Sequence, residues 1–187
     1  IASSCARVLV EGIWFNGVGS SRDQGIHIRT SADYTTIRHC RFQRCSGWAI
    51  QVNDGAGSPT LGFVCQDNFF IDTCGDGVHP MNADGFIIEN NVFWQCGDDA
   101  IAALAQSTTI RPKNGIIKGN FIYGRTTALA GTNTSGFRGI VVFIGENILI
   151  EGNIIYNTRG QAIEVADEYN SSLYNKGIIV RGIQIRG

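Results

Sequence analysis

The chain is poor in several features that would assign it to a common class. Its 187 residues include only 3 prolines, 3 histidines and 1 methionine, and its charges nearly cancel, leaving a formal net charge of −1. So little net charge excludes the basic surface that binds nucleic acid or an anionic membrane. No apolar run approaches the ~18 residues of a membrane-spanning helix, and residues 1–10 lack the cationic start and the cleavage site of a signal peptide.

Helix-period patterns are also missing. The best candidate for an amphipathic helix, residues 98–107 (DDAIAALAQS), is interpreted as a strand that enters a loop. The chain instead contains 24 glycines and short runs of Ile, Val, Phe and Asn that end at Gly, Asn, Asp or Ser. This composition is typical of strands and turns, so the sequence predicts an all-β protein.

Four segments of the chain resemble one another, and each has an asparagine where one short strand turns into the next. Self-similarity at a period of about 20 to 50 residues is typical of solenoids. A side-chain amide stacked on its copy in the next coil can form hydrogen bonds along the axis. We therefore expect a ladder formed by Asn68, Asn91, Asn120 and Asn153.

A second repeat aligns six short segments on a central apolar residue. These residues are predicted to form one inward-facing ladder: Ile26, Ile50, Val78, Ile101, Ile140 and Ile163. Each follows a glycine or an alanine, which keeps the outward face of its strand low enough for a ligand to lie along it. Six copies predict at least six coils.

Stacked coils with short strands, turn asparagines and apolar ladders resemble the right-handed parallel β-helix of the pectin-lyase-like superfamily. The resemblance implies a single β-helix domain over residues 1–187, with about seven coils. A solenoid coil is covered only by its neighbours, so both ends of the stack need a cap. Neither end of this sequence contains one, and we therefore expect exposed apolar ends and a domain truncated at both ends, as a segment of a longer β-helix.

Two acidic corners, CGDG at 74–77 and CGDD at 96–99, occupy the same place in consecutive coils. Parallel strands stack roughly 4.8 Å apart, so Asp76, Asp98 and Asp99 are expected to converge. Three like charges are costly unless a proton is shared, a cation is bound or donors surround them. Turn chemistry and calcium ligation are the alternatives, and catalysis is the favoured interpretation.

Pro80, which cannot donate to a strand ladder, predicts a local break beside this corner.

The acidic pattern resembles the catalytic residues of polygalacturonases and of β-helical dextranases and alpha-1,3-glucanases. The resemblance implies a glycoside hydrolase in which one aspartate protonates the glycosidic oxygen and the others activate water, with inversion of the anomeric centre. Stacking at ~5 Å is, however, nearer the carboxyl separation of retaining enzymes. Asp99 is the candidate acid. The histidine that follows the aspartate pair in polygalacturonases is absent here, which favours a neutral, alpha-glucan-like substrate over galacturonate.

Flanking positions supply the candidate contacts to a polysaccharide or oligosaccharide substrate, which implies an extracellular or cell-surface location. These residues are His79, Arg138, Trp48, Gln51 and Glu164. Arg138 is expected to contact the substrate or pair with an acid of the cluster, or else only to cap backbone carbonyls. Trp48 could simply fill a corner. Two insertions rich in Gly, Thr, Asn and Ser, at 104–115 and 124–137, are expected to wall the cleft.

Two other functions stay open at this point. In a calcium-dependent polysaccharide lyase the aspartates would hold Ca²⁺ and Arg138 would abstract a proton; a non-catalytic β-helix of an adhesin or tailspike would need neither. No cofactor is expected outside the lyase alternative, and no cysteine spacing suggests zinc. Cys74 and Cys96 could form a disulfide, but Cys45 extends their column, which favours a stack of free thiols.

Overall fold

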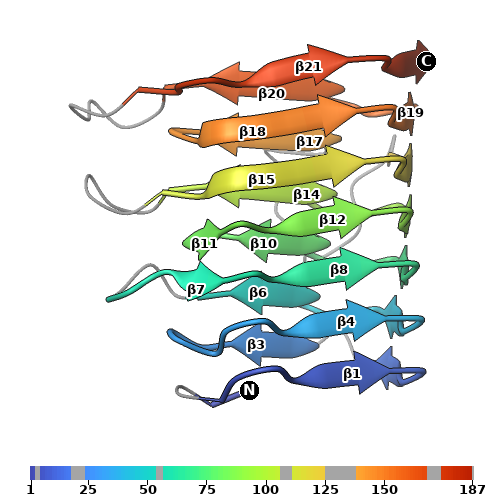
Figure 1. The fold of residues 1–187 in the computed structure, drawn as a ribbon. Helices are drawn as coiled ribbons and strands as arrows, with labels where there is room; N and C mark the ends of the chain where they lie inside the picture. The colour runs from blue at the N-terminus through green and yellow to red at the C-terminus, as the bar shows by residue number, and fades with distance from the viewer. Residues whose placement is uncertain are drawn as a thin grey trace.

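The computed structural model is a right-handed stack of seven coils (Figure 1). The structure describes residues 1–2, 5–17, 24–53, 57–105, 111–124, 138–167 and 174–186. Within these ranges the chain forms strands and turns only, and no helix long and apolar enough to cross a membrane occurs among them. The predicted all-β solenoid of about seven coils is confirmed.

Three sheets run along the stack, and every strand pairs in parallel with the equivalent strand of the neighbouring coil. Sheet A consists of β1 (Leu9–Glu11), β4 (Thr36–Arg38), β7 (Thr60–Leu61), β8 (Val64–Gln66), β11 (Ala83–Asp84), β12 (Ile87–Glu89), β15 (Lys113–Lys118), β18 (Glu146–Glu151) and β21 (Ile179–Arg181). Sheet B consists of β2 (Trp14–Asn16), β5 (Arg41–Gln43), β9 (Phe69–Ile71), β13 (Val92–Trp94), β16 (Phe121–Tyr123), β19 (Ile154–Tyr156) and β22 (Gln184–Arg186). Sheet C consists of β3 (Ile26–Ile28), β6 (Ile50–Val52), β10 (Val78–Pro80), β14 (Ile101–Leu104), β17 (Ile140–Phe143) and β20 (Ile163–Ala166).

The register of sheet C confirms the predicted inward ladder. Its central residues pair directly from coil to coil: Ile26 with Ile50, Ile50 with Val78, Val78 with Ile101, Ile101 with Ile140, and Ile140 with Ile163. Four of these side chains are fully buried. Because each strand alternates inward and outward residues, this register also decides which polar residues line up on the outer face.

The asparagine ladder lies at the corner between sheets A and B. The amide Nδ2 of Asn68 donates to Oδ1 of Asn91 (3.1 Å), Asn91 donates likewise to Asn120 (3.1 Å), and Asn120 to Asn153 (2.9 Å). Each of these amide oxygens also accepts the backbone N–H of the preceding ladder residue. The four side chains are buried, so the ladder satisfies polar groups that water cannot reach.

A second ladder, of aromatic rings, fills the interior behind sheet B. Phe15, Phe42, Phe70 and Phe93 stack nearly parallel, with ring centroids 4.8, 4.9 and 4.6 Å apart. The spacing matches the distance between parallel strands, so each ring is held by the coils above and below. Beyond Phe93 the equivalent positions are Ile122 and Ile155.

Pro80 interrupts sheet C beside the acidic corner, as predicted. Strand β10 pairs with β6 over all three of its residues, but with β14 only at Val78. The N–H of Val78 donates to the carbonyl of Ala100 on the β14 side (3.0 Å). The next donor toward that side would be the nitrogen of residue 80, and proline has no N–H, so the ladder stops.

The first and last coils carry exposed apolar side chains, as expected for coils at the ends of a stack. In the last coil, Val180 and Ile185 continue the columns of the buried Ile150 and Ile155, yet they are 45% and 61% exposed. In the first coil, Phe15 is half-buried although its partner Phe42 is fully buried.

The six cysteines form no disulfide with one another, and Cys45 and Cys96 are buried while Cys74 is half-buried. The structure thus contains a column of Cys45, Cys74 and Cys96 without a Cys74–Cys96 disulfide.

Candidate functional site

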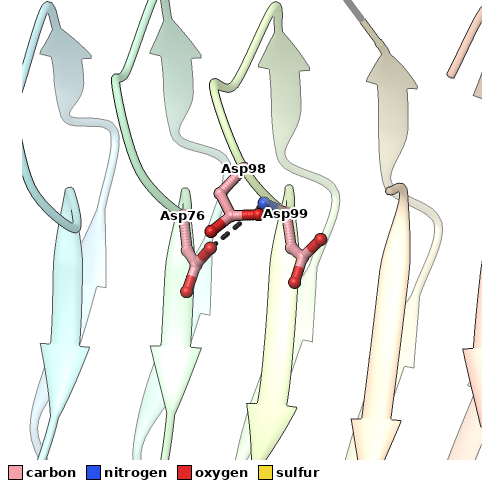
Figure 2. Close-up of side chains that lie close together, drawn as sticks. All are labelled: Asp76, Asp98 and Asp99. Carbon is pink, nitrogen blue, oxygen red and sulfur yellow. Dashed lines mark hydrogen bonds between the residues drawn. The ribbon is translucent and has the colours of Figure 1, made fainter. Parts of the chain in front are cut away.

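The acidic residues converge at the corners that lead into two neighbouring strands of sheet C. Asp76 lies two residues before the first residue of β10, and Asp99 lies two residues before the first residue of β14. Figure 2 shows their side chains side by side, with Asp98 between them. One carboxylate oxygen from each of the three residues lies within 4.8 Å of the other two. The convergence expected from the spacing of the two corners is thus present.

Asp76 is buried and each of its oxygens has its own neighbour. Oδ1 accepts the backbone N–H of Asp99 at 3.1 Å, the interaction drawn as a dashed line in Figure 2. Oδ2 lies 2.8 Å from Nδ1 of His79. The backbone of one coil therefore fixes the carboxylate of the coil before it, and a histidine from the following strand contacts its other oxygen.

Asp99 is held by a cation from the next coil. Nε of Arg138 donates to Oδ1 of Asp99 at 2.8 Å, and Nη2 donates to Oδ2 at 2.9 Å. The third nitrogen, Nη1, donates to Oε2 of Glu164 at 2.8 Å, and the guanidinium lies 5.4 Å from the ring centroid of Phe143. Of the two roles considered for Arg138, pairing with the acidic cluster is the one that the structure shows. The contact with Phe143, the last residue of β17, was not anticipated from the sequence.

The electrostatics of Asp99 reflect opposing effects. Burial and the neighbouring carboxylate of Asp76 raise the pKa of Asp99 to about 7, while the hydrogen bonds and charge of Arg138 act in the opposite direction. For Arg138, burial alone would lower the pKa, but the hydrogen bonds and charges of Asp99 and Glu164 outweigh it and raise the pKa above its ordinary value. The cluster can therefore retain a proton near neutral pH while the guanidinium stays charged.

The three aspartates differ in their access to solvent. Asp76 and Asp99 are only 3% and 1% exposed, whereas Asp98 is half-buried. The backbone N–H of Asp98 donates to the carbonyl of Gly75 at 3.4 Å, which places Asp98 at the turn itself. The trio thus combines two buried carboxyl groups with one that reaches the surface. A purely turn-forming role explains the position of Asp98 but not the burial of the other two.

The residues predicted to contact substrate lie close to the trio, but they are less open than expected. His79 is 3% exposed and packs its ring edge-on against Trp48, with centroids 5.2 Å apart. Gln51, aligned with His79 in β6, is also buried, and its amide oxygen accepts a hydrogen bond from Gln24. Trp48 and Glu164 are half-buried. Trp94 of β13 stacks on Tyr123 of β16 in sheet B, with ring centroids 4.4 Å apart.

The outward face of sheet C beside the trio is covered. Ala102 and Val141 point outward in β14 and β17 and pair with each other, yet both are fully buried. The expectation of a low, open face at these positions is therefore wrong for this structure. Most of the two insertions predicted to wall the cleft, residues 106–110 and 125–137, lies outside the described part of the chain.

Comparisons with known proteins agree with this architecture. A family model described as "Right handed beta helix region" matches residues 2–184. A mutant of the periplasmic alginate epimerase AlgG has a similar structure (TM-score 0.66, 14% identity), covering 98% of this chain and 46% of that chain. The surface protein and adhesin PfbA of Streptococcus pneumoniae is similar over 84% of this chain and 50% of its own, with 15% identity and a TM-score of 0.41. This chain thus spans about half the length of either protein, and at such identities the likeness concerns the fold. A comparison with curated protein sequences found no match.

Proposed function

Because the chain belongs to the right-handed β-helix family, we propose that it is a glycoside hydrolase that cleaves a polysaccharide with Asp76, Asp98 and Asp99. The observation that carries this proposal is the convergence of three carboxyl groups within 4.8 Å across two coils. Hydrolysis of a glycosidic bond needs one carboxyl group that gives a proton and another that activates water or attacks carbon. Two neighbouring coils hold such groups rigidly.

Asp98 is the group that we assign as the proton donor. From the sequence Asp99 was the candidate acid, and its pKa is raised to about 7 by burial and by Asp76. Both oxygens of Asp99, however, accept hydrogen bonds from Arg138, so neither is turned toward a substrate. Asp98 is the half-buried member of the trio. A general acid must reach the leaving oxygen within hydrogen-bond distance, and this requirement favours the accessible group.

Asp76 and Asp99 are proposed to hold the attacking water. All four of their oxygens already contact a donor or a cation: the N–H of Asp99, His79 and, twice, Arg138. Each oxygen has a second lone pair that can still accept a hydrogen bond from water. Carboxylates whose oxygens already have such partners are better suited to orient a water than to form a covalent glycosyl ester. The proposed outcome is therefore inversion.

A neutral glycan is the substrate class that we propose. The site contains the carboxyl groups of the trio and of Glu164, against one guanidinium that is already paired with Asp99 and Glu164. A uronate carboxylate would meet negative charge here, with no spare cation among the site residues that the structure describes. Trp48 and Glu164, both half-buried, are the proposed contacts to sugars on either side of the cleaved bond, whereas Gln51 is too buried for this role. A polymeric substrate implies action outside the cytoplasm, and the similar AlgG is described as periplasmic.

A calcium-dependent lyase is the second candidate, favoured by the spacing of the carboxylates. Oxygens of three aspartates within 4.8 Å of one another would suit a hard divalent cation. Arg138 is nevertheless a poor base for such a reaction, because Asp99 and Glu164 raise its pKa and keep it protonated. Proton abstraction requires a group whose pKa is lowered toward the working pH.

The test is the release of reducing ends from a panel of neutral glucans and uronic polymers, each with and without EGTA. We expect cleavage of a neutral glucan that the chelator does not affect. Cleavage restricted to uronic polymers, with unsaturated products and loss of activity in EGTA, would establish the lyase. A folded protein that binds but cleaves none of the polymers would point to a non-catalytic β-helix instead.

A further inference from the structure

His79 is a buried titratable residue to which the proposed hydrolysis assigns no step. It points outward from β10, yet only 3% of it is exposed. Across sheet C it pairs with the neutral Gln51 of β6, and no pairing joins it to β14, where the ladder stops after Val78. A side chain so deeply buried is poorly suited to contact a sugar. The role of His79 is therefore inferred from the residues that it contacts.

Two contacts fix the imidazole ring of His79. Nδ1 lies 2.8 Å from Oδ2 of Asp76, and the ring meets Trp48 at an interplanar angle of 81°. Three residues in an extended strand would separate Asp76 from His79 by roughly 10 Å. The short contact therefore depends on the corner at Gly77, where an added Cβ would come within 2.6 Å of the carbonyl oxygen of Ala100. The sharp turn at Gly77 is thus the backbone feature that brings His79 close to Asp76.

The contact distinguishes Asp76 from Asp99. Asp99 is neutralised by Arg138, whereas the side-chain partner of Asp76 is His79. Asp98 and Asp99 beside Asp76 are acidic, and an N–H of His79 can offset part of the negative charge on Asp76. Among the described residues, neither ring nitrogen of His79 makes a hydrogen bond, so its contact with Asp76 is the close approach of Nδ1 to Oδ2 at 2.8 Å. The ring is accordingly held by this electrostatic contact and by its packing on Trp48.

We propose that His79 is a positioning residue that, through Nδ1, orients the Asp76 carboxylate toward the attacking water, with Trp48 holding the imidazole in place. This inference rests on the proposed hydrolase function. It replaces the expectation that His79 binds substrate. In this role His79 affects the chemical step, because a misdirected carboxylate lowers the rate of water attack, and it leaves substrate binding nearly unchanged.

Three substitutions separate this role from substrate binding. His79→Asn places an amide nitrogen close to the position of Nδ1, His79→Gln places one close to Nε2, and His79→Phe keeps a ring against Trp48 without any nitrogen. We expect kcat to fall by about tenfold or more in His79→Phe and His79→Gln, with KM within about twofold of wild type, and His79→Asn to recover most of the activity. A rise in KM with an unchanged kcat, or equal loss in all three variants with intact folding, would overturn the proposal.

A measurement without substrate tests the contact itself. The chain has 3 histidines, so the imidazole ¹⁵N signals of His79 can be assigned by their loss in His79→Asn. Replacing Asp76 with alanine should shift the proton of His79 from Nδ1 toward Nε2, whereas Asp67→Asn, at an exposed residue of a distant corner, should leave the signals unchanged. Unchanged signals in Asp76→Ala would refute the contact. If no glycan is cleaved, the proposed function fails while this result still decides whether His79 holds Asp76.

Discussion

Arg138 and Asp99 are joined by two parallel hydrogen bonds, Nε to Oδ1 at 2.8 Å and Nη2 to Oδ2 at 2.9 Å, although 39 residues separate them in the chain. Such a two-pronged contact is the strongest geometry available to a guanidinium and a carboxylate. Burial and Asp76 nonetheless raise the pKa of Asp99 to about 7. One cation does not fully offset the cost of holding three carboxyl groups at one corner.

The raised pKa of Asp99 predicts that the stability of the folded protein depends on pH. The pKa of Asp99 is raised from 3.8 to about 7 in the folded protein, so between these values the folded state binds a proton that the unfolded state has lost. The contribution of Asp99 to the free energy of unfolding is fully present below pH 3.8 and is lost as the pH rises to about 7. We expect a decline of at most about 1.4 kcal/mol per pH unit in this window. Urea denaturation at a series of pH values measures it.

The matched variant for this experiment is Asp99→Asn, which is neutral at every pH. Its free energy of unfolding should depend less steeply on pH between about 4 and about 7 than that of the wild type, since it lacks the titrating group. The same slope in both proteins would show that Asp99 titrates normally in the folded state.

If the proposed hydrolysis is correct, single replacement of Asp76, Asp98 or Asp99 should abolish most of the activity. Asp76→Asn, Asp98→Asn and Asp99→Asn are each expected to lower kcat by a factor on the order of 10² or more, because a positioned acid or base contributes about that much. Initial rates of reducing-end release provide the measurement. Asp67→Asn is the control, since Asp67 is exposed and its φ of 54° suits asparagine equally well. Activity that survives all three substitutions would exclude the trio from catalysis.

The stereochemical course can be observed directly. ¹H NMR of the first product should show the inverted anomer, because the oxygens of Asp76 and Asp99 are already engaged and are poor nucleophiles. The compact spacing of the trio, within 4.8 Å, argues in the other direction, since retaining enzymes have carboxyl groups about 5–5.5 Å apart and inverting enzymes about 6.5–9.5 Å apart. A retained anomer would identify one aspartate as a covalent nucleophile.

The asparagine ladder should be a main determinant of stability. In Asn120→Ala the backbone N–H of Asn91 and the carbonyl of Ile88 each lose a side-chain partner inside the stack. The side-chain amide of Asn91 loses one of its two bonds and keeps the one to the carbonyl of Cys65. Each unsatisfied buried group costs about 1–3 kcal/mol, so we expect a loss of about 3 kcal/mol or more. Asn16→Ala, at an exposed position of β2, should change the free energy of unfolding by less than about 0.5 kcal/mol. Denaturant titration compares the two, and similar losses would contradict a structural ladder.

Much of the fold could be predicted because the repeat length of a solenoid sequence determines which residues of consecutive coils pair. Asn68 and Asn91 stand 23 residues apart and stack directly, and the same alignment pairs Val78 with Ile101 and brings Asp76 beside Asp99. In a stack of parallel strands, equivalent positions in consecutive coils are spatial neighbours. The sequence alone therefore established the three-dimensional neighbourhood of the acidic corners, and the effect of Pro80 followed from its missing N–H.

The tertiary structure decided which of these neighbours are buried and which atoms they contact. His79 and Gln51 stand at outward positions of their strands, and alternation predicted exposure for both, yet both are buried. Whether the outer face of a strand is covered depends on chain segments outside the strands. The alternation of residues along a strand gives no information about the path of those segments. The pairing of Arg138 with both Asp99 and Glu164, and the contact of His79 with Asp76, likewise depend on rotamers and on the depth of each corner. Repeat spacing specifies where the backbone passes, whereas the ionisation and the accessibility of a side chain are set by everything packed around it.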